Sequence, residues 1–155
     1  MIRRMPTHCF DDTCPSCVIA DGFIFLAHHA GGFDQPDAAY QARAVFERMK
    51  STLASAGATL NDMVQINLYL RHIADFEAVV GVFEEYFSPG CFPARMTLTT
   101  DFIDAQCLCQ MDGIARLPQA IPSPADELLQ WKRLLDEGII SPKEFDALKR
   151  KLLAL

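Results

Sequence analysis

Arg95 is the residue whose type and position most clearly indicate chemistry, and it follows the run Cys91-Phe92-Pro93-Ala94. A strand that begins directly after the proline would carry Arg95, Thr97 and Thr99 on one face, because side chains alternate along a strand. A planar guanidinium beside two hydroxyls suits a carboxylate that accepts two parallel hydrogen bonds. This spacing favours a site for a small carboxylate ligand. The alternative is a structural ion pair with an acidic neighbour in the protein.

Cysteines and histidines form a second candidate group, for metal binding or redox chemistry. Cys14-Pro15-Ser16-Cys17 is a CxxC motif, with Cys9 upstream and the pair His28-His29 downstream. Two thiolates and two imidazoles can hold zinc, and a lone CxxC can be a redox pair. However, there is no second CxxC, Cys17 falls in a predicted strand, and adjacent histidines in a strand point to opposite faces. We therefore expect structural cysteines, with no metal and no cofactor.

Acidic residues offer proton carriers, namely Asp101, Asp104 and Asp112. Only Asp112 lies inside a predicted strand, where burial would raise the pKa of its carboxyl group. A solvated residue at a strand end is the alternative. The chain contains no GxSxG, HExxH or P-loop motif.

The hydrophobic pattern predicts the elements that position these residues. Two short apolar runs flank Asp21-Gly22, a pair typical of hairpin turns because both central positions need a positive φ. Apolar residues recur at helical spacing after Asp37 and after Asp75. Alternating segments predict strands over Met63–Leu70, Ala94–Thr100 and Gln106–Ala115.

The predicted order is β-β-α-β-α-β-β, an α+β fold in which two helices cover one face of a sheet of about five strands. The other face is too apolar to remain in water, so we expect a homo-oligomer.

The pattern divides the chain into a domain over residues 1–118, a linker over 119–123 and a helical hairpin over 124–155. Ser123-Pro124-Ala125-Asp126 is a helix start, and Ser141-Pro142-Lys143-Glu144 is a capping box. A hairpin of about 30 residues buries little core alone, so we expect it to dock onto another surface.

The net charge is −6, and the charge deficit lies in the first domain, because the hairpin carries six basic and six acidic residues. Nucleic-acid binding requires a basic surface that displaces counterions, so we expect no nucleic-acid partner. No apolar run approaches the ~20 residues that span a bilayer, and no apolar stretch follows Arg3-Arg4. We therefore expect a soluble, cytoplasmic protein without a membrane partner.

Seven segments of the first domain follow one another in a characteristic order and spacing. They are Gln41-Ala42-Arg43, Leu53-Ala54-Ser55-Ala56-Gly57-Ala58, Met63–Leu70, Asp75-Phe76, Tyr86-Phe87, Phe92-Pro93-Ala94-Arg95 and Asp112-Gly113-Ile114-Ala115. Through them, residues 41–115 resemble the RidA family, also called YjgF or L-PSP endoribonuclease-like. The resemblance implies a chorismate-mutase-like fold and a homotrimer with ligand clefts between subunits. It also implies hydrolysis of reactive 2-imino and 2-enamino acids to 2-keto acids and ammonia.

The resemblance places Arg95 on the family's carboxylate-binding arginine, but other positions depart from the family pattern. Gln110 stands where active members have a glutamate that positions the attacking water, and Thr97 stands where they have a cysteine. An amide orients water but exchanges no proton. His28 or His29 could replace the lost proton carrier and line the substrate site.

These departures leave a second reading, a non-catalytic trimer that binds a small carboxylate. A ribonuclease or translation inhibitor, the label that some relatives carry, conflicts with the acidic first domain.

The hairpin also has a recognisable pattern, with Leu128, Leu134, Leu135, Gly138-Ile139-Ile140-Ser141, Glu144-Phe145 and Lys149–Leu153. It resembles the SHOCT motif, a short C-terminal helical module. The resemblance implies a role in oligomerisation or in contact with a protein partner.

Overall fold

The structure is a computed structural model that describes residues 1–118 and 124–152. Its contacts divide the chain into two compact units, Met1–Pro118 and Gln119–Leu155. The linker expected at residues 119–123 lies outside the described residues. Within the described ranges, no helix combines the length and the apolar character needed to cross a bilayer.

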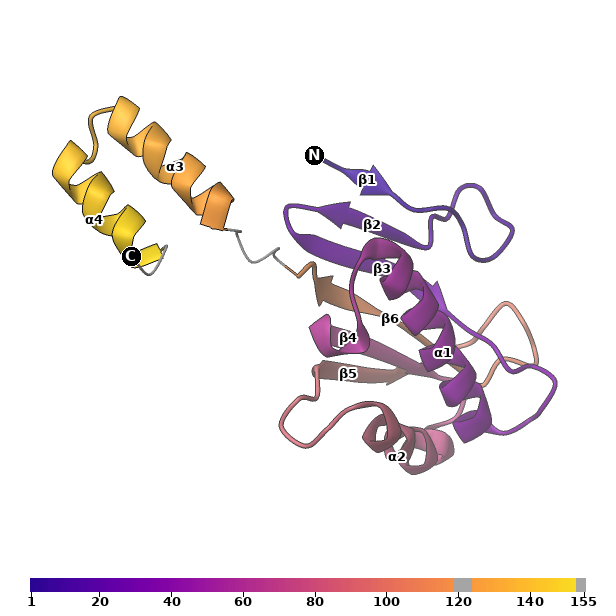
Figure 1. Cartoon of the computed structure of the whole chain (residues 1–155). Coiled ribbons are helices and arrows are strands. Elements are labelled where there is room, and N and C mark those ends of the chain that lie inside the picture. The colour runs from indigo at the N-terminus through magenta and orange to yellow at the C-terminus, as the bar shows by residue number, and fades with distance from the viewer. Residues whose placement is uncertain (119–123, 153–155) are drawn as a thin grey trace. The chain divides into compact units, whose positions relative to one another are not determined.

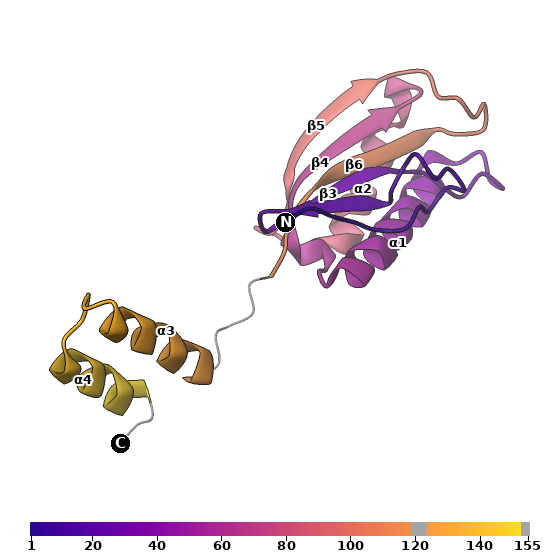
Figure 2. The same ribbon diagram turned by 90° about the horizontal axis from the view of Figure 1, so that it is seen from above.

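The first unit is built on a six-stranded sheet in the order β1-β2-β3-β6-β4-β5 (Figure 1). The strands are β1 Arg3–Arg4, β2 Cys17–Ala20, β3 Phe23–His29, β4 Met63–Leu70, β5 Ala94–Thr99 and β6 Cys109–Arg116. Neighbouring strands pair antiparallel except β4 and β5, which run parallel. Strand β5 is an edge strand, and the sheet is visibly twisted in Figure 2.

Helices α1 (Ala38–Ala56) and α2 (Phe76–Tyr86) pack against each other and against one face of the sheet. Short 3₁₀ helices, η1 Leu60–Asp62 and η2 Ile73–Asp75, precede β4 and α2. The Asp37 carboxylate caps α1 by accepting from the Tyr40 backbone N–H at 2.7 Å. Gly57 ends the helix with a φ of 89°, a left-handed conformation that favours glycine.

The core between the helices and the sheet is aromatic at its centre. The Phe46 ring of α1 stacks on Tyr86 at 4.5 Å and meets Phe83 edge-on at 5.0 Å. Apolar side chains of β3, β4 and β6 complete the core. The α+β fold and the order of elements predicted from the sequence are confirmed, and the Asp21-Gly22 turn has positive φ at both residues.

The largest differences from the predicted strands concern β1 and the start of β6. Strand β1 was not predicted, because two residues are too short to show an alternating pattern. Strand β6 begins at Cys109 rather than at Gln106. The buried Gln41 side chain explains the later start, because it donates to the Gln106 carbonyl at 2.9 Å and accepts from the Leu108 N–H at 2.8 Å. These bonds replace strand pairing for that segment.

The apolar face of β4 also differs from the prediction at one end. Alternation along β4 places Val64 on the same face as the buried residues Ile66 and Leu68, but Val64 is 45% exposed and Met63 is buried instead. The pairing of β4 with β6 shifts register between Met63 and Gln65, which exchanges the two faces at this point. Gly113 permits the shift, because a Cβ atom there would lie 2.2 Å from the Gln65 carbonyl oxygen.

The second unit is an antiparallel pair of helices, α3 (Pro124–Asp136) and α4 (Pro142–Leu152). Gly138 ends α3 with a φ of 70°, and its N–H donates to the Leu135 carbonyl at 3.0 Å. The capping box starts α4, because the Glu144 carboxylate accepts from the Ser141 N–H at 2.8 Å. None of the described residues of α3 and α4 is fully buried within this unit.

Candidate functional site

Arg95 lies on edge strand β5, on the face of the sheet that the helices cover. It is opposite Ile66 of β4, which is fully buried, so both side chains share this face. Its guanidinium carbon lies 5.0 Å from the centre of the Phe83 ring and 5.6 Å from the centre of the Phe76 ring, both on α2. These cation–π contacts hold the arginine at the open edge of the sheet.

The guanidinium of Arg95 has no hydrogen bond or ion pair with any residue that the structure describes. Arg95 therefore has no acidic partner within residues 1–118 or 124–152 for the structural ion pair that was the alternative. Thr97 is half-buried and lies two residues further along the same face. A fork of five N–H donors beside a hydroxyl remains available to an anion.

Gln110 lies on the opposite face of the sheet from Arg95. It pairs with Tyr69 on β4, whereas its neighbour Met111 pairs with Leu68, and both of these apolar side chains are fully buried under the helices. Alternation therefore directs Gln110 to the face without helices. Within one chain, the Arg95 and Gln110 side chains therefore do not lie in the same site.

A polar cluster lies on the same open face as Gln110. The Asp112 carboxylate accepts from the Tyr69 hydroxyl at 2.7 Å and from the Asn67 amide at 2.7 Å. Gln65 donates to the Asn67 side-chain oxygen at 3.0 Å. The hydrogen bond to Asp112 raises the pKa of Tyr69, and partial burial adds to this effect.

Sequence reasoning identified Asp112 but not its partners Tyr69 and Asn67. Their alternating positions in β4 did signal a polar face, but only the register with β6 shows which carboxylate they hold.

The two candidate histidines occupy different environments. His28 is exposed, whereas His29 is fully buried, and Thr52 of α1 is within 2.8 Å of its Nε2 atom. The ring of His8 stacks on His29 at 4.3 Å, and its Nε2 atom lies 2.9 Å from the His28 carbonyl oxygen. Since both nitrogens of His29 have partners inside the protein, only His28 can meet a ligand directly.

Burial of His29 predicts a loss of stability in mild acid. Burial, followed by the charge of His8, lowers the pKa of His29 from 6.5 to about 4, and His28 and Arg48 lower it less. The unfolded chain therefore binds this proton more readily, so stability present above pH 6.5 is lost as the pH falls toward 4. We expect this group to reduce the free energy of unfolding by about 2 kcal/mol between pH 7 and pH 5.

Urea denaturation at both pH values checks this expectation. A His29→Gln chain should lose correspondingly less stability between them, because glutamine can still hydrogen-bond Thr52 but does not titrate. An equal loss in both proteins would contradict the assignment.

The CxxC motif does not act as a unit. Cys17 is 1% exposed in the core on β2, whereas Cys14 is half-buried in the preceding loop. Burial raises the pKa of the Cys17 thiol. No group of three or more histidine, cysteine or acidic side chains that could hold a metal occurs among the described residues.

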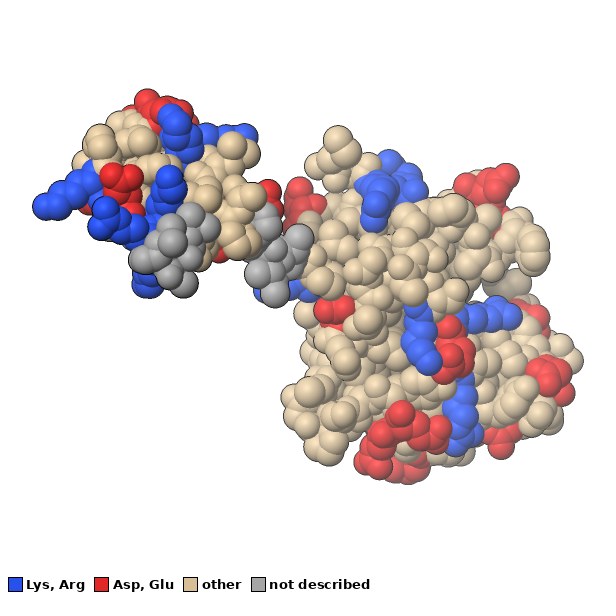
Figure 3. All heavy atoms as spheres, in the orientation of Figure 1, with Lys and Arg blue, Asp and Glu red and all other residues tan. Residues whose placement is uncertain are grey.

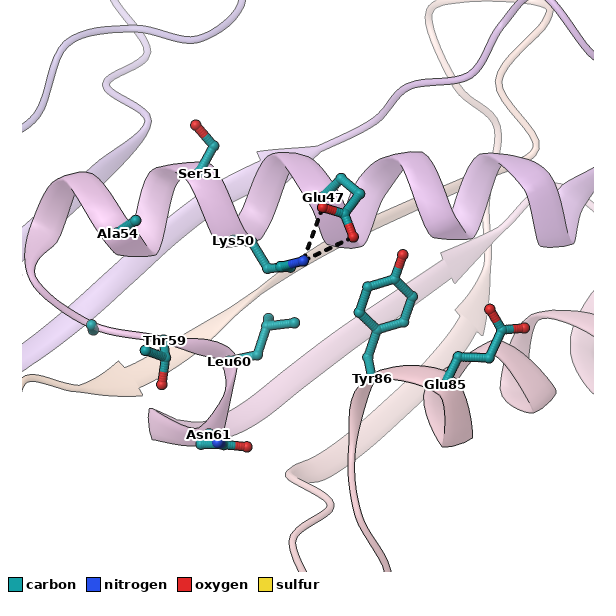
Figure 4. A pocket seen from close by; sticks show the side chains of 10 residues that line it. Glu47, Lys50, Ser51, Ala54, Thr59, Leu60, Asn61, Glu85 and Tyr86 are labelled. Atoms are coloured by element: carbon teal, nitrogen blue, oxygen red, sulfur yellow. Dashed lines mark hydrogen bonds and ion pairs between the residues drawn. The ribbon is translucent and has the colours of Figure 1, made fainter.

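An open cleft of about 900 Å³ lies on the helical side of the first unit (Figure 4). It is lined by Glu47, Lys50, Ser51, Ala54, Ala58, Thr59, Leu60, Asn61, Glu85 and Tyr86. Its charged groups are already paired, because Lys50 binds Glu47 at 3.0 Å and Glu85 binds Arg43 at 2.6 Å. Burial raises the pKa of Tyr86 to about 12, so its phenol stays protonated. Because the cationic side chain that lines this cleft is already paired, the cleft is a weaker candidate for anion binding than Arg95.

Comparison with known proteins finds a family match within each unit. Residues 16–117 match the family described as Endoribonuclease L-PSP, and residues 126–153 match the one described as Short C-terminal domain. A RutC family protein of Pyrococcus abyssi is 33% identical over 99 residues, which are 60% of this chain and 77% of the relative.

Two further relatives carry names of enzymes. The 3-aminoacrylate deaminase RutC of Acinetobacter baylyi is 35% identical over 81 residues, covering 52% of this chain and 64% of that protein. A 2-iminobutanoate/2-iminopropanoate deaminase of Dermatophagoides farinae is 39% identical over 79 residues, covering 51% of this chain and 50% of that protein.

Solved structures share the fold of the first unit. A YjgF family protein of Neisseria meningitidis has a TM-score of 0.71 at 23% identity, covering 77% of this chain and 98% of the other. A yjgF family protein of Streptococcus pyogenes has a TM-score of 0.68 at 29% identity, covering 76% of this chain and 98% of the other.

Proposed function

This chain belongs to the endoribonuclease L-PSP (RidA/YjgF) family over residues 16–117, and we propose that it binds a small imino or enamino acid and hydrolyses it to a 2-keto acid and ammonia. The observation that carries the proposal is the guanidinium of Arg95, which no described acidic side chain neutralises. Two relatives named as deaminases of such substrates support this choice of ligand.

The proposed site lies between subunits of a homotrimer. Arg95 and Gln110 occupy opposite faces of one sheet, so a single ligand meets both only if they come from different chains. The open face and strand β5 expose large apolar side chains, namely Phe23, Phe25, Met96 and Leu98, each 39–59% exposed. Burial of this surface between subunits would stabilise the assembly.

Each residue then has a defined role. Arg95 binds the substrate carboxylate through two parallel hydrogen bonds, and the Thr97 hydroxyl donates a third. Gln110 orients a water that adds to the imine carbon, which gives a carbinolamine. The C–N bond then breaks, ammonia leaves and the 2-keto acid remains. Asp112 and Tyr69, which share a hydrogen bond on the Gln110 face, are one titratable pair that can move protons there, and exposed His28 is a second proton carrier.

A non-catalytic carboxylate-binding trimer is the second candidate, and the amide at Gln110 favours it. A ribonuclease role is disfavoured by the net charge of −6. On the face shown in Figure 3, acidic and basic side chains of the first unit are interspersed. We place the protein in the cytoplasm, and we assign the hairpin to further oligomerisation or to contact with a protein partner.

Replacing Gln110 by glutamate tests the catalytic proposal. We expect both proteins to accelerate the loss of 2-iminobutanoate generated in situ, and the Gln110→Glu chain to be faster by at least about tenfold near neutral pH. The reason is that a carboxylate accepts a proton from the attacking water, a contribution of roughly 10²–10⁴ in many enzymes. If neither protein accelerates the loss of 2-iminobutanoate above the rate in buffer, the hypothesis of catalysis is wrong. The hypothesis of carboxylate binding without catalysis then remains.

The oligomeric state tests the composite site. Sedimentation equilibrium of the full chain should give three times the chain mass of 17.3 kDa. A Met96→Asp chain should shift toward monomer, because it would bury a charge at the interface of the proposed trimer. A wild-type monomer at micromolar concentration would contradict a site shared between chains.

A further inference from the structure

The loop that connects β1 to β2 contains two cysteines outside the core. The antiparallel register of β1 and β2 continues beyond the strands to a bridge between Thr7 and Pro15. Two backbone hydrogen bonds, of 3.0 and 3.1 Å, join the two arms before this bridge. Cys9 and Cys14 follow the bridge on opposite arms, so the hairpin holds them near each other.

Local hydrogen bonds fix the backbone on both sides of the pair. The Cys9 N–H donates to the Thr7 hydroxyl at 3.3 Å, and the Cys9 sulfur lies 3.5 Å from the same oxygen. The Cys14 N–H donates to the Asp11 carbonyl at 3.0 Å, and the Thr13 N–H donates to the Asp11 carboxylate at 2.9 Å. Within this turn, the Cys9 side chain is close enough to the Cys14 thiol to raise its pKa.

The pair of cysteines that the structure brings together, Cys9 and Cys14, differs from the pair in the CxxC motif. The CxxC motif pairs Cys14 with Cys17, but Cys17 is 1% exposed on the core side of β2. Cys9 is exposed and Cys14 is half-buried, and both are free thiols. Of the cysteines that the structure describes, Cys9 has solvent access together with a neighbouring thiol.

We propose that Cys9 and Cys14 form a redox site, which a peroxide converts to a reversible intramolecular disulfide. The Cys9 thiolate attacks one peroxide oxygen, the O–O bond breaks, and the hydroxide that leaves takes up a proton to become water. Cys9 is then a sulfenic acid. The Cys14 sulfur attacks the Cys9 sulfur, the S–S bond forms, the S–O bond breaks, and a second water leaves with the thiol proton. Two thiols are oxidised and one peroxide is reduced.

The electrostatic setting assigns the order of attack. Burial, followed by Cys9, raises the pKa of the Cys14 thiol, and the Asp11 carboxylate raises it further. Cys14 is therefore the resolving thiol and exposed Cys9 the attacking one.

Thiol counting and peptide mapping test the site. The full chain is treated with hydrogen peroxide in its folded state, then denatured, alkylated and cleaved before aspartates, which separates residues 1–10 from 12–20. The alkylated thiols should fall by two from the six of the untreated chain. The two peptides should be joined by a disulfide that dithiothreitol reverses. Cys17→Ala and Cys91→Ser should leave this link intact, whereas Cys9→Ser and Cys14→Ser should each abolish it.

Three outcomes would overturn the proposal. One is a link that Cys17→Ala removes, which would assign the disulfide to Cys17. Another is a peroxide-induced dimer on a non-reducing gel that replaces the internal link. The third is stable sulfenic or sulfinic acid on Cys9 with Cys14 still alkylated.

Discussion

Replacing Arg95 by alanine is expected to weaken the binding of 2-oxobutanoate, a 2-keto acid of the proposed product class, by roughly 100-fold. A charge-assisted hydrogen bond contributes about 1.5–3 kcal/mol, and this side chain offers two in parallel. No other described cation shares its face of β5, since Thr97 and Thr99 are its neighbours there. Titration calorimetry of the full chain measures the loss directly.

Two further variants separate charge, geometry and folding in this experiment. Arg95→Lys keeps the charge but loses the planar fork, so it should recover only part of the affinity. Arg4→Ala removes another exposed arginine, on β1, and should bind like the wild type. Unchanged affinity of the Arg95→Ala chain would contradict both the catalytic and the non-catalytic hypothesis, because both depend on the contact between Arg95 and the ligand carboxylate.

Replacing Gly113 by alanine is expected to lower the free energy of unfolding by about 3 kcal/mol, the upper part of the range for overpacking. The added Cβ atom would lie 2.2 Å from the Gln65 carbonyl oxygen and 2.7 Å from the Met63 methyl group. The methionine can rotate away, but the carbonyl belongs to the backbone of β4 at its register shift. Relief therefore requires the central strands to separate, and urea denaturation of the variant measures the cost.

Gly81→Ala is the matched control for this substitution. Gly81 lies within α2, and a Cβ atom there would meet nothing within 4 Å. Alanine is a better helix former than glycine by about 1 kcal/mol, so this variant should be slightly more stable than the wild type. A Gly113→Ala chain with wild-type stability would contradict the close backbone approach at the β4–β6 pair.

Features set by local pattern were predictable from the sequence. Residues 63–70 form a strand with the predicted bounds, Gly57 ends α1, and Asp21-Gly22 forms the hairpin turn. Each depends on neighbouring residues alone, through alternation, glycine geometry or turn preference. The relation of Arg95 to Thr97 is of the same kind, since both lie on one strand two residues apart.

Features set by pairing between distant segments were not predictable. The opposite faces of Arg95 and Gln110 follow from the registers of β5 and β6 against β4. The burial of His29 depends on Thr52 of α1, and the neighbourhood of Cys9 and Cys14 depends on a hairpin whose first strand has two residues. A sequence pattern gives the two faces of each strand but not how one strand aligns with the next.

The most direct test of the proposed function is a coupled assay that generates 2-iminobutanoate in situ and follows its loss with the wild-type chain, the Arg95→Ala chain and buffer. We predict acceleration by the wild type alone, which would establish hydrolysis that depends on Arg95 even though Gln110 cannot exchange a proton. A wild-type rate equal to that of buffer, or equal acceleration by Arg95→Ala, would contradict the proposal.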